Sequence, residues 1–85
     1  MDEDDAPTVV EAVAGQLASH RAQRGLSLEE AAARARIDAE RLELAENADV
    51  VLDEEELTRL ADAYGVGITA FFGGRVTPIQ YLFGA

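Results

Sequence analysis

The side chains that could perform chemistry are mostly carboxylates, and their spacing does not form a catalytic site. Glu54, Glu55 and Glu56 are consecutive, so on a helix they point in different directions and do not converge on one substrate. The chain has a single histidine, His20, and no cysteine, so a metal ion would lack a second ligand of either kind. We therefore expect no enzymatic activity, no cofactor and no metal ion, and a partly buried imidazole at His20.

The overall charge opposes non-specific binding to nucleic acid. Seventeen Asp and Glu residues against seven basic residues, all of them Arg, give a formal net charge of −10. Such a chain repels a phosphate backbone at long range, although a local group of arginines can still contact it. The absence of cysteine, the acidic amino terminus and the lack of an apolar run of about 20 residues predict a cytoplasmic protein without a membrane span.

Residues 27–48 predict two short helices joined by a tight turn. Ser27 and Glu30 have the spacing of a capping box, so the first helix should begin at Leu28. Asp38 is expected to cap the second helix. Small residues on the first helix would let the second approach closely: Ala31, Ala32 and Ala35. This arrangement is a helix-turn-helix, a unit whose second helix DNA-reading proteins place in the major groove.

Three further helices complete the predicted domain. We expect them at residues 9–24, at residues 53–64 after a capping box formed by Asp53 and Glu56, and at residues 66–72. The fold class is therefore all-α, a compact five-helix domain over residues 8–74. Residues 1–7 are expected to be a disordered acidic tail.

Residues 75–85 form a short apolar segment. The run from Thr77 to Gln80 fits the start of a sixth helix, whereas the alternation of apolar residues after it fits a strand. In either case these side chains need cover from their own domain or from a second copy. We expect a homodimer, with docking inside the monomer as the alternative. The candidate dimerisation residues are Phe71, Phe72, Ile79, Tyr81, Leu82 and Phe83.

Residues 13–72 resemble the phage-repressor-like (Xre-type) helix-turn-helix family. The resemblance rests on the Arg-Gly-Leu-Ser entry at residues 24–27, on Ile37-Asp38, and on the run from Leu57 to Val66. It implies a five-helix lambda-repressor-like domain, usually dimeric, that binds operator DNA as a transcriptional regulator. It also implies a structural ion pair between two matching positions: Arg21 and Glu46.

Several positions depart from the pattern of that family. Arg36 and Ala48 stand where glycine is usual, which makes the backbone there less ordinary. Acidic residues occupy positions that commonly face bases and phosphates: Glu40, Glu43 and Asp49. Residues 27–48 together hold six acidic residues and three arginines. The DNA-facing half of the motif is therefore poor in conventional base readers.

Two hypotheses follow from this conflict. In the first, the chain is a regulator that binds double-stranded DNA as a homodimer: Arg41 and Asn47 read bases, and Ser27 and Arg36 contact phosphates. Arg41→Ala is then expected to abolish operator binding or change its sequence specificity without changing thermal unfolding. In the second, the helix-turn-helix has become a protein-interaction module whose acidic face meets a basic protein partner.

Overall fold

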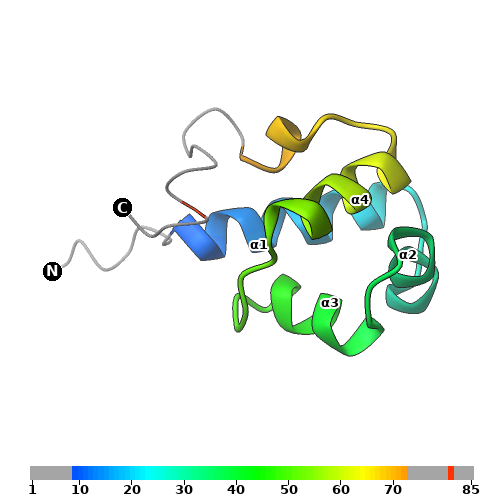
Figure 1. Cartoon of the computed structure of the whole chain (residues 1–85), viewed down its shortest axis with the longest axis horizontal. Helices are drawn as coiled ribbons and strands as arrows, with labels where there is room; N and C mark the ends of the chain where they lie inside the picture. Colours follow the sequence, from blue (N-terminus) through cyan, green and yellow to red (C-terminus); the bar gives the residue numbers. More distant parts are fainter. Residues whose placement is uncertain (1–8, 73–80, 82–85) are drawn as a thin grey trace, which may run out of the picture.

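The computed structural model of the chain describes residues 9–72 and residue 81. Within these residues it contains four α-helices and no strand (Figure 1). The elements are α1 (Val9–Gln23), α2 (Leu28–Ala35), α3 (Ala39–Glu46), α4 (Glu54–Tyr64) and a short 3-10 helix, η2 (Ile68–Phe71). The all-α fold class is confirmed. None of these helices is long and apolar enough to cross a bilayer.

The expected fifth α-helix at residues 66–72 is wrong, since η2 is a 3-10 helix of four residues. Gly67 precedes it, and so short a segment cannot form enough α-helical bonds to offset nucleation. The expected acidic tail lies outside the described residues, as does the expected sixth helix or strand apart from Tyr81, which has a helical conformation.

Local capping explains where the helices begin. The Ser27 hydroxyl accepts a hydrogen bond from the Glu30 amide at 3.0 Å, and the Ser27 amide donates to the Glu30 carboxylate at 2.9 Å. Asp53 and Glu56 repeat this reciprocal box at the start of α4. Asp38 stands at the N-cap of α3 without a side-chain cap bond, so the expected cap by its carboxylate is absent.

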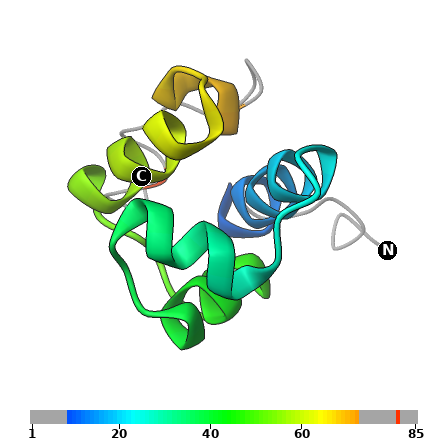
Figure 2. The ribbon, with the colours of Figure 1, turned by 90° about the vertical axis from the view of Figure 1, so that its right-hand side faces the viewer.

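The helices surround one small core. α2 packs against both α3 and α4, while α1 packs against α3 and η2. Figure 1 shows α2 at one end of the molecule. Figure 2 shows α1 and α4 on opposite sides of the molecule. The largest fully buried side chains come from the α3–α4 loop and from every element except α2, which buries only alanines: Val13, Leu17, Leu42, Leu52, Leu57, Leu60 and Phe71.

Three of the candidate dimerisation residues pack inside their own chain. Phe71, Phe72 and Tyr81 are all at most 4% exposed. The rings of Phe72 and Tyr81 meet edge to face at 5.8 Å, and the Tyr81 hydroxyl accepts a hydrogen bond from the buried Leu52 amide at 3.0 Å. These three side chains are therefore not on the surface of the single chain. The other three candidates, Ile79, Leu82 and Phe83, lie outside the described residues.

Candidate nucleic-acid interface

The carboxyl end of α3 is tied to α1 by a two-pronged ion pair. The Arg21 guanidinium donates to both Glu46 carboxylate oxygens, at 2.8 and 2.9 Å, and donates a third bond to the Leu26 carbonyl at 2.9 Å. The Glu46 side chain is 7% exposed and that of Arg21 is 22% exposed. The bond to Glu46 raises the pKa of Arg21. This pair, which the family resemblance implied, fixes the orientation of α3 against α1.

The opposite flank of α3 is tied to α4 by a second pair. Arg41 donates to both carboxylate oxygens of Glu56, at 2.6 and 2.9 Å. One oxygen of Glu56 also accepts the capping bond from the Asp53 amide. Because the Arg41 guanidinium favours the ionised carboxylate, the pKa of Glu56 is lowered. The expected base reader, Arg41, is therefore held by the fold, and its removal would affect unfolding, contrary to the expectation from the sequence.

Sequence spacing assigned Glu56 to a cap but missed its bond to Arg41. The two residues are 15 positions apart on different helices. A helical pattern relates residues three or four positions apart and carries no information on such a pair.

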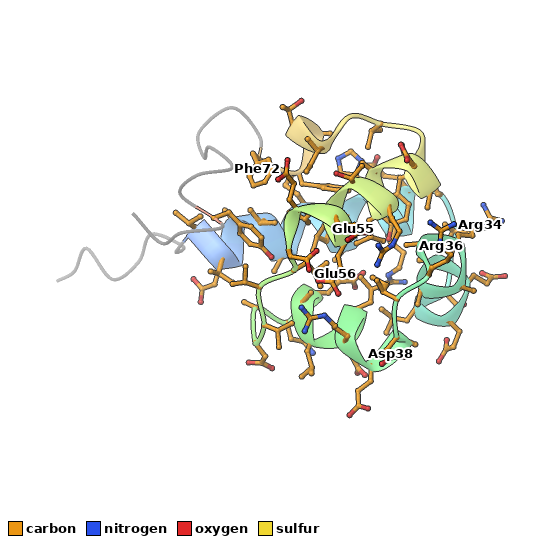
Figure 3. The ribbon with its side chains drawn as sticks, in the orientation of Figure 1. Arg34, Arg36, Asp38, Glu55, Glu56 and Phe72 are labelled. Atoms are coloured by element: carbon orange, nitrogen blue, oxygen red, sulfur yellow. The ribbon has the colours of Figure 1, made fainter. Side chains whose placement is uncertain are left out.

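The solvent-facing side of α3 is acidic, with one exposed leucine. Its exposed residues are Asp38, Glu40, Glu43, Leu44 and Asn47. The leucine is 36% exposed, and Val51 in the following loop is 39% exposed. Figure 3 shows Asp38 where α3 begins, pointing away from the core. Among these residues only Asn47 is a conventional base reader.

The two proposed phosphate contacts lie at opposite ends of α2. Ser27 precedes the helix and its hydroxyl is engaged in the cap, whereas Arg36 follows the helix and is exposed. Eight residues of helix separate them, a length of about 12 Å. The predicted DNA contacts therefore do not form one compact group.

Both residues that replace a usual glycine adopt a left-handed backbone. The φ angle is 59° at Arg36 and 65° at Ala48. This region is disfavoured for residues with a Cβ atom, so the expectation of an unusual backbone at these two positions is confirmed.

His20 is a packing residue in this fold. It is half-buried on α1, and its ring meets that of Phe71 edge to face at 5.6 Å. No group of three or more potential metal ligands comes together among the described residues.

The comparisons with known proteins agree with this geometry. The model of a helix-turn-helix domain family matches residues 12–70, so the chain belongs to the helix-turn-helix family. Together with the solved structures that follow, this match confirms the resemblance to the Xre type. No curated protein matches the sequence significantly.

Two solved structures have a similar shape, each with a TM-score of 0.73. One is an HTH_3 family transcriptional regulator from Vibrio cholerae, 25% identical, with the match covering 79% of this chain and 38% of that chain. The other is the clp gene regulator ClgR from Corynebacterium glutamicum, 28% identical, with 76% and 69% covered. The chain thus spans well under half the length of the Vibrio regulator.

Proposed function

We propose that this chain is a transcription regulator that binds operator DNA as a homodimer through α2 and α3. The observation that supports it best is the arrangement of these helices in a domain shaped like two known transcription regulators, at a TM-score of 0.73. In such domains the second helix of the motif enters the major groove. Asn47 would read a base edge, and Ser27 and Arg36 would contact phosphates.

A dimer is part of this proposal because helix-turn-helix proteins commonly read two half-sites about one helical turn apart. Since Phe71, Phe72 and Tyr81 are buried, the remaining candidates for the interface are Ile79, Leu82 and Phe83. Replacing those three by serine keeps the Tyr81 anchor and should halve the mass measured by sedimentation. An unchanged mass would remove them from the interface.

The first test is binding to duplex DNA from upstream of the gene, compared with a random duplex of equal length. Fluorescence anisotropy at about 50 mM and about 200 mM salt should show selective binding that weakens steeply with salt, because phosphate contacts release counterions. Equal affinity for both duplexes would contradict operator recognition.

A matched pair of variants tests the reader role. Asn47→Ala should reduce selectivity for the upstream duplex without changing thermal unfolding, since the side chain of Asn47 is exposed. Gln23→Ala removes an exposed amide from α1 and should leave both properties unchanged. Equal selectivity in the two variants would exclude Asn47 as a reader.

A second function is favoured by the acidic surface of α3 and by the engagement of Arg41 with Glu56. In that case the chain is a protein-interaction module whose α3 surface meets a basic partner. Binding to neither duplex, even at low salt, would support this function. Increased DNA affinity on changing Glu40 and Glu43 to Gln would instead support DNA docking, with these acids weakening it.

A further inference from the structure

Most of the arginines in the described residues are engaged in the fold. Four of the six have guanidinium hydrogen bonds: Arg21, Arg24, Arg41 and Arg59. Arg59, for example, caps the end of α2 by donating to the Ala35 carbonyl at 2.8 Å, and it pairs with Glu55. The side chains of Arg34 and Arg36 are exposed and form no hydrogen bond or ion pair with any described residue.

These two free cations line one surface pocket. The pocket lies between the end of α2 and the carboxyl-terminal half of α4, has a volume of about 200 Å³, and is lined by Arg34, Arg36, Arg59, Asp62 and Ala63. Figure 3 shows Arg34 and Arg36 at the same end of the molecule, far from Phe72. The volume is below the roughly 300–1,000 Å³ of pockets that enclose drug-sized ligands. A single small group therefore fits it best.

The charge of the pocket is opposite to that of the chain. Three arginines and one acidic residue, Asp62, line it on a protein with a net charge of −10, and Arg59 is also paired with Glu55. The two bonds of Arg59 use its Nε and Nη1 atoms, so its Nη2 makes no bond to a described residue. Guanidinium groups bind phosphate oxygens in pairs, and a phosphate has enough acceptors for several such groups. The pocket is thus suited to a phosphate group.

The backbone at Arg36, which lines the pocket, is strained. A φ of 59° disfavours an L-residue by about 1–2 kcal/mol, and glycine would avoid that strain. A positive charge near the end of α2 interacts favourably with the helix dipole, but Arg34 in the last turn already supplies one. Strain of this kind clusters at functional sites and therefore agrees with a role for the Arg36 side chain, although Ala48 adopts the same conformation.

We propose that the pocket formed by Arg34, Arg36 and Arg59 binds a phosphate group. The phosphate is either part of a DNA backbone, in which case the proposal rests on the proposed function, or part of a small phosphorylated molecule. In both cases Arg34 and Arg36 donate paired hydrogen bonds to its oxygens, and the Nη2 of Arg59 adds one more.

Titration with inorganic phosphate tests the pocket without DNA. We would follow the backbone amide and arginine Nε resonances of the isotope-labelled full chain while chloride holds the ionic strength constant. The resonances of Arg34, Arg36 and Arg59 should shift and saturate together. The double variant Arg34→Gln, Arg36→Gln should bind roughly tenfold more weakly or worse, because charge-assisted bonds are lost. Asp62→Asn should bind more tightly.

Two controls separate this site from general charge and from stability. The double variant Ala22→Glu, Gln23→Glu lowers the net charge by the same amount on α1, which contributes no residue to the pocket, and should bind phosphate as the original chain does. Arg36→Gly and Ala48→Gly each relieve one left-handed position, so both should unfold at higher temperature. Only Arg36→Gly should lose phosphate affinity.

The same variants, titrated with a random duplex, identify the source of the phosphate. Weaker duplex binding by Arg34→Gln, Arg36→Gln than by the charge-matched control would assign the pocket to the DNA backbone. Equal duplex binding by the two, with phosphate affinity still lost, would assign it to a small phosphorylated ligand. Shifts that do not saturate, or that persist in Arg34→Gln, Arg36→Gln, would overturn the proposal whatever the result with operator DNA.

Discussion

The arginines beside α3 and the arginines at the end of α2 are used in different ways. Arg21 and Arg41 each hold a glutamate with two hydrogen bonds, so the helix expected to enter DNA is fixed in place but leaves mainly acids exposed. The side chains of Arg34 and Arg36 have no hydrogen-bond or ion-pair partner among the described residues, and both line a pocket. The arginines beside α3 are thus used to hold the helices together, and the positive charge that remains available to a ligand lies at the end of α2.

The largest effect should come from the pair that fixes the carboxyl end of α3. Arg21→Met leaves the Glu46 carboxylate, 7% exposed, without its partner, so the free energy of unfolding should fall by about 3 kcal/mol. Urea denaturation measures this. Adding Glu46→Leu should recover part of the loss, because an apolar pair needs no charge compensation. A loss below about 1 kcal/mol would make this an ordinary surface pair.

A smaller effect is expected from the pair on the other flank of α3. Glu56→Gln removes the charge but keeps an acceptor for the capping bond, and should cost about 1 kcal/mol at pH 7, since the Arg41 side chain is 40% exposed.

This effect should depend on pH. The folded pKa of Glu56 lies below its ordinary value of about 4.3, so the pair stabilises the fold fully above that value. The contribution is lost as the pH falls through the folded pKa. Urea denaturation of both proteins between pH 7 and pH 3 should therefore show the difference shrinking with acidity. If the difference in unfolding free energy between the two proteins did not change with pH, the ionisation of Glu56 would not contribute to stability.

The left-handed positions should respond in the opposite direction. Ala48→Gly relieves a backbone φ of 65° and should raise the free energy of unfolding by about 1 kcal/mol. Thermal unfolding followed by circular dichroism measures it. No gain would mean that the surrounding loop, rather than the Cβ atom, determines the stability at this position.

The smallest effect should come from a free arginine. Arg34→Gln removes an exposed side chain without a described partner, so its unfolding free energy should stay within about 0.5 kcal/mol of the original. A loss as large as that for Arg21→Met would erase the difference between the two groups of arginines.

The parts of the fold that local sequence determines were predictable. Ser27 with Glu30 and Asp53 with Glu56 begin helices because each box needs only residues three positions apart. Gly65, at a φ of 73°, ends α4 for an equally local reason. Four helices therefore followed from the sequence, whereas η2 did not, because a short segment between glycines has little intrinsic preference.

The candidate site was less predictable because it depends on contacts between helices. The bond from Arg41 to Glu56 and the pocket shared by Arg34, Arg36 and Arg59 join α2 or α3 to α4. No periodicity within one helix encodes such contacts. The composition gives the number of arginines, but it does not indicate which of their side chains remain without a partner in the folded chain.

The hydrogen bond between Leu52 and Tyr81 affects how the chain can fold during its synthesis. The amide of Leu52 is buried, and its acceptor lies 29 residues further along the chain. A growing chain that has reached Phe72 holds every helix described here but still lacks the partner for this amide. The α3–α4 loop can therefore reach its final stability only after Tyr81 has left the ribosome.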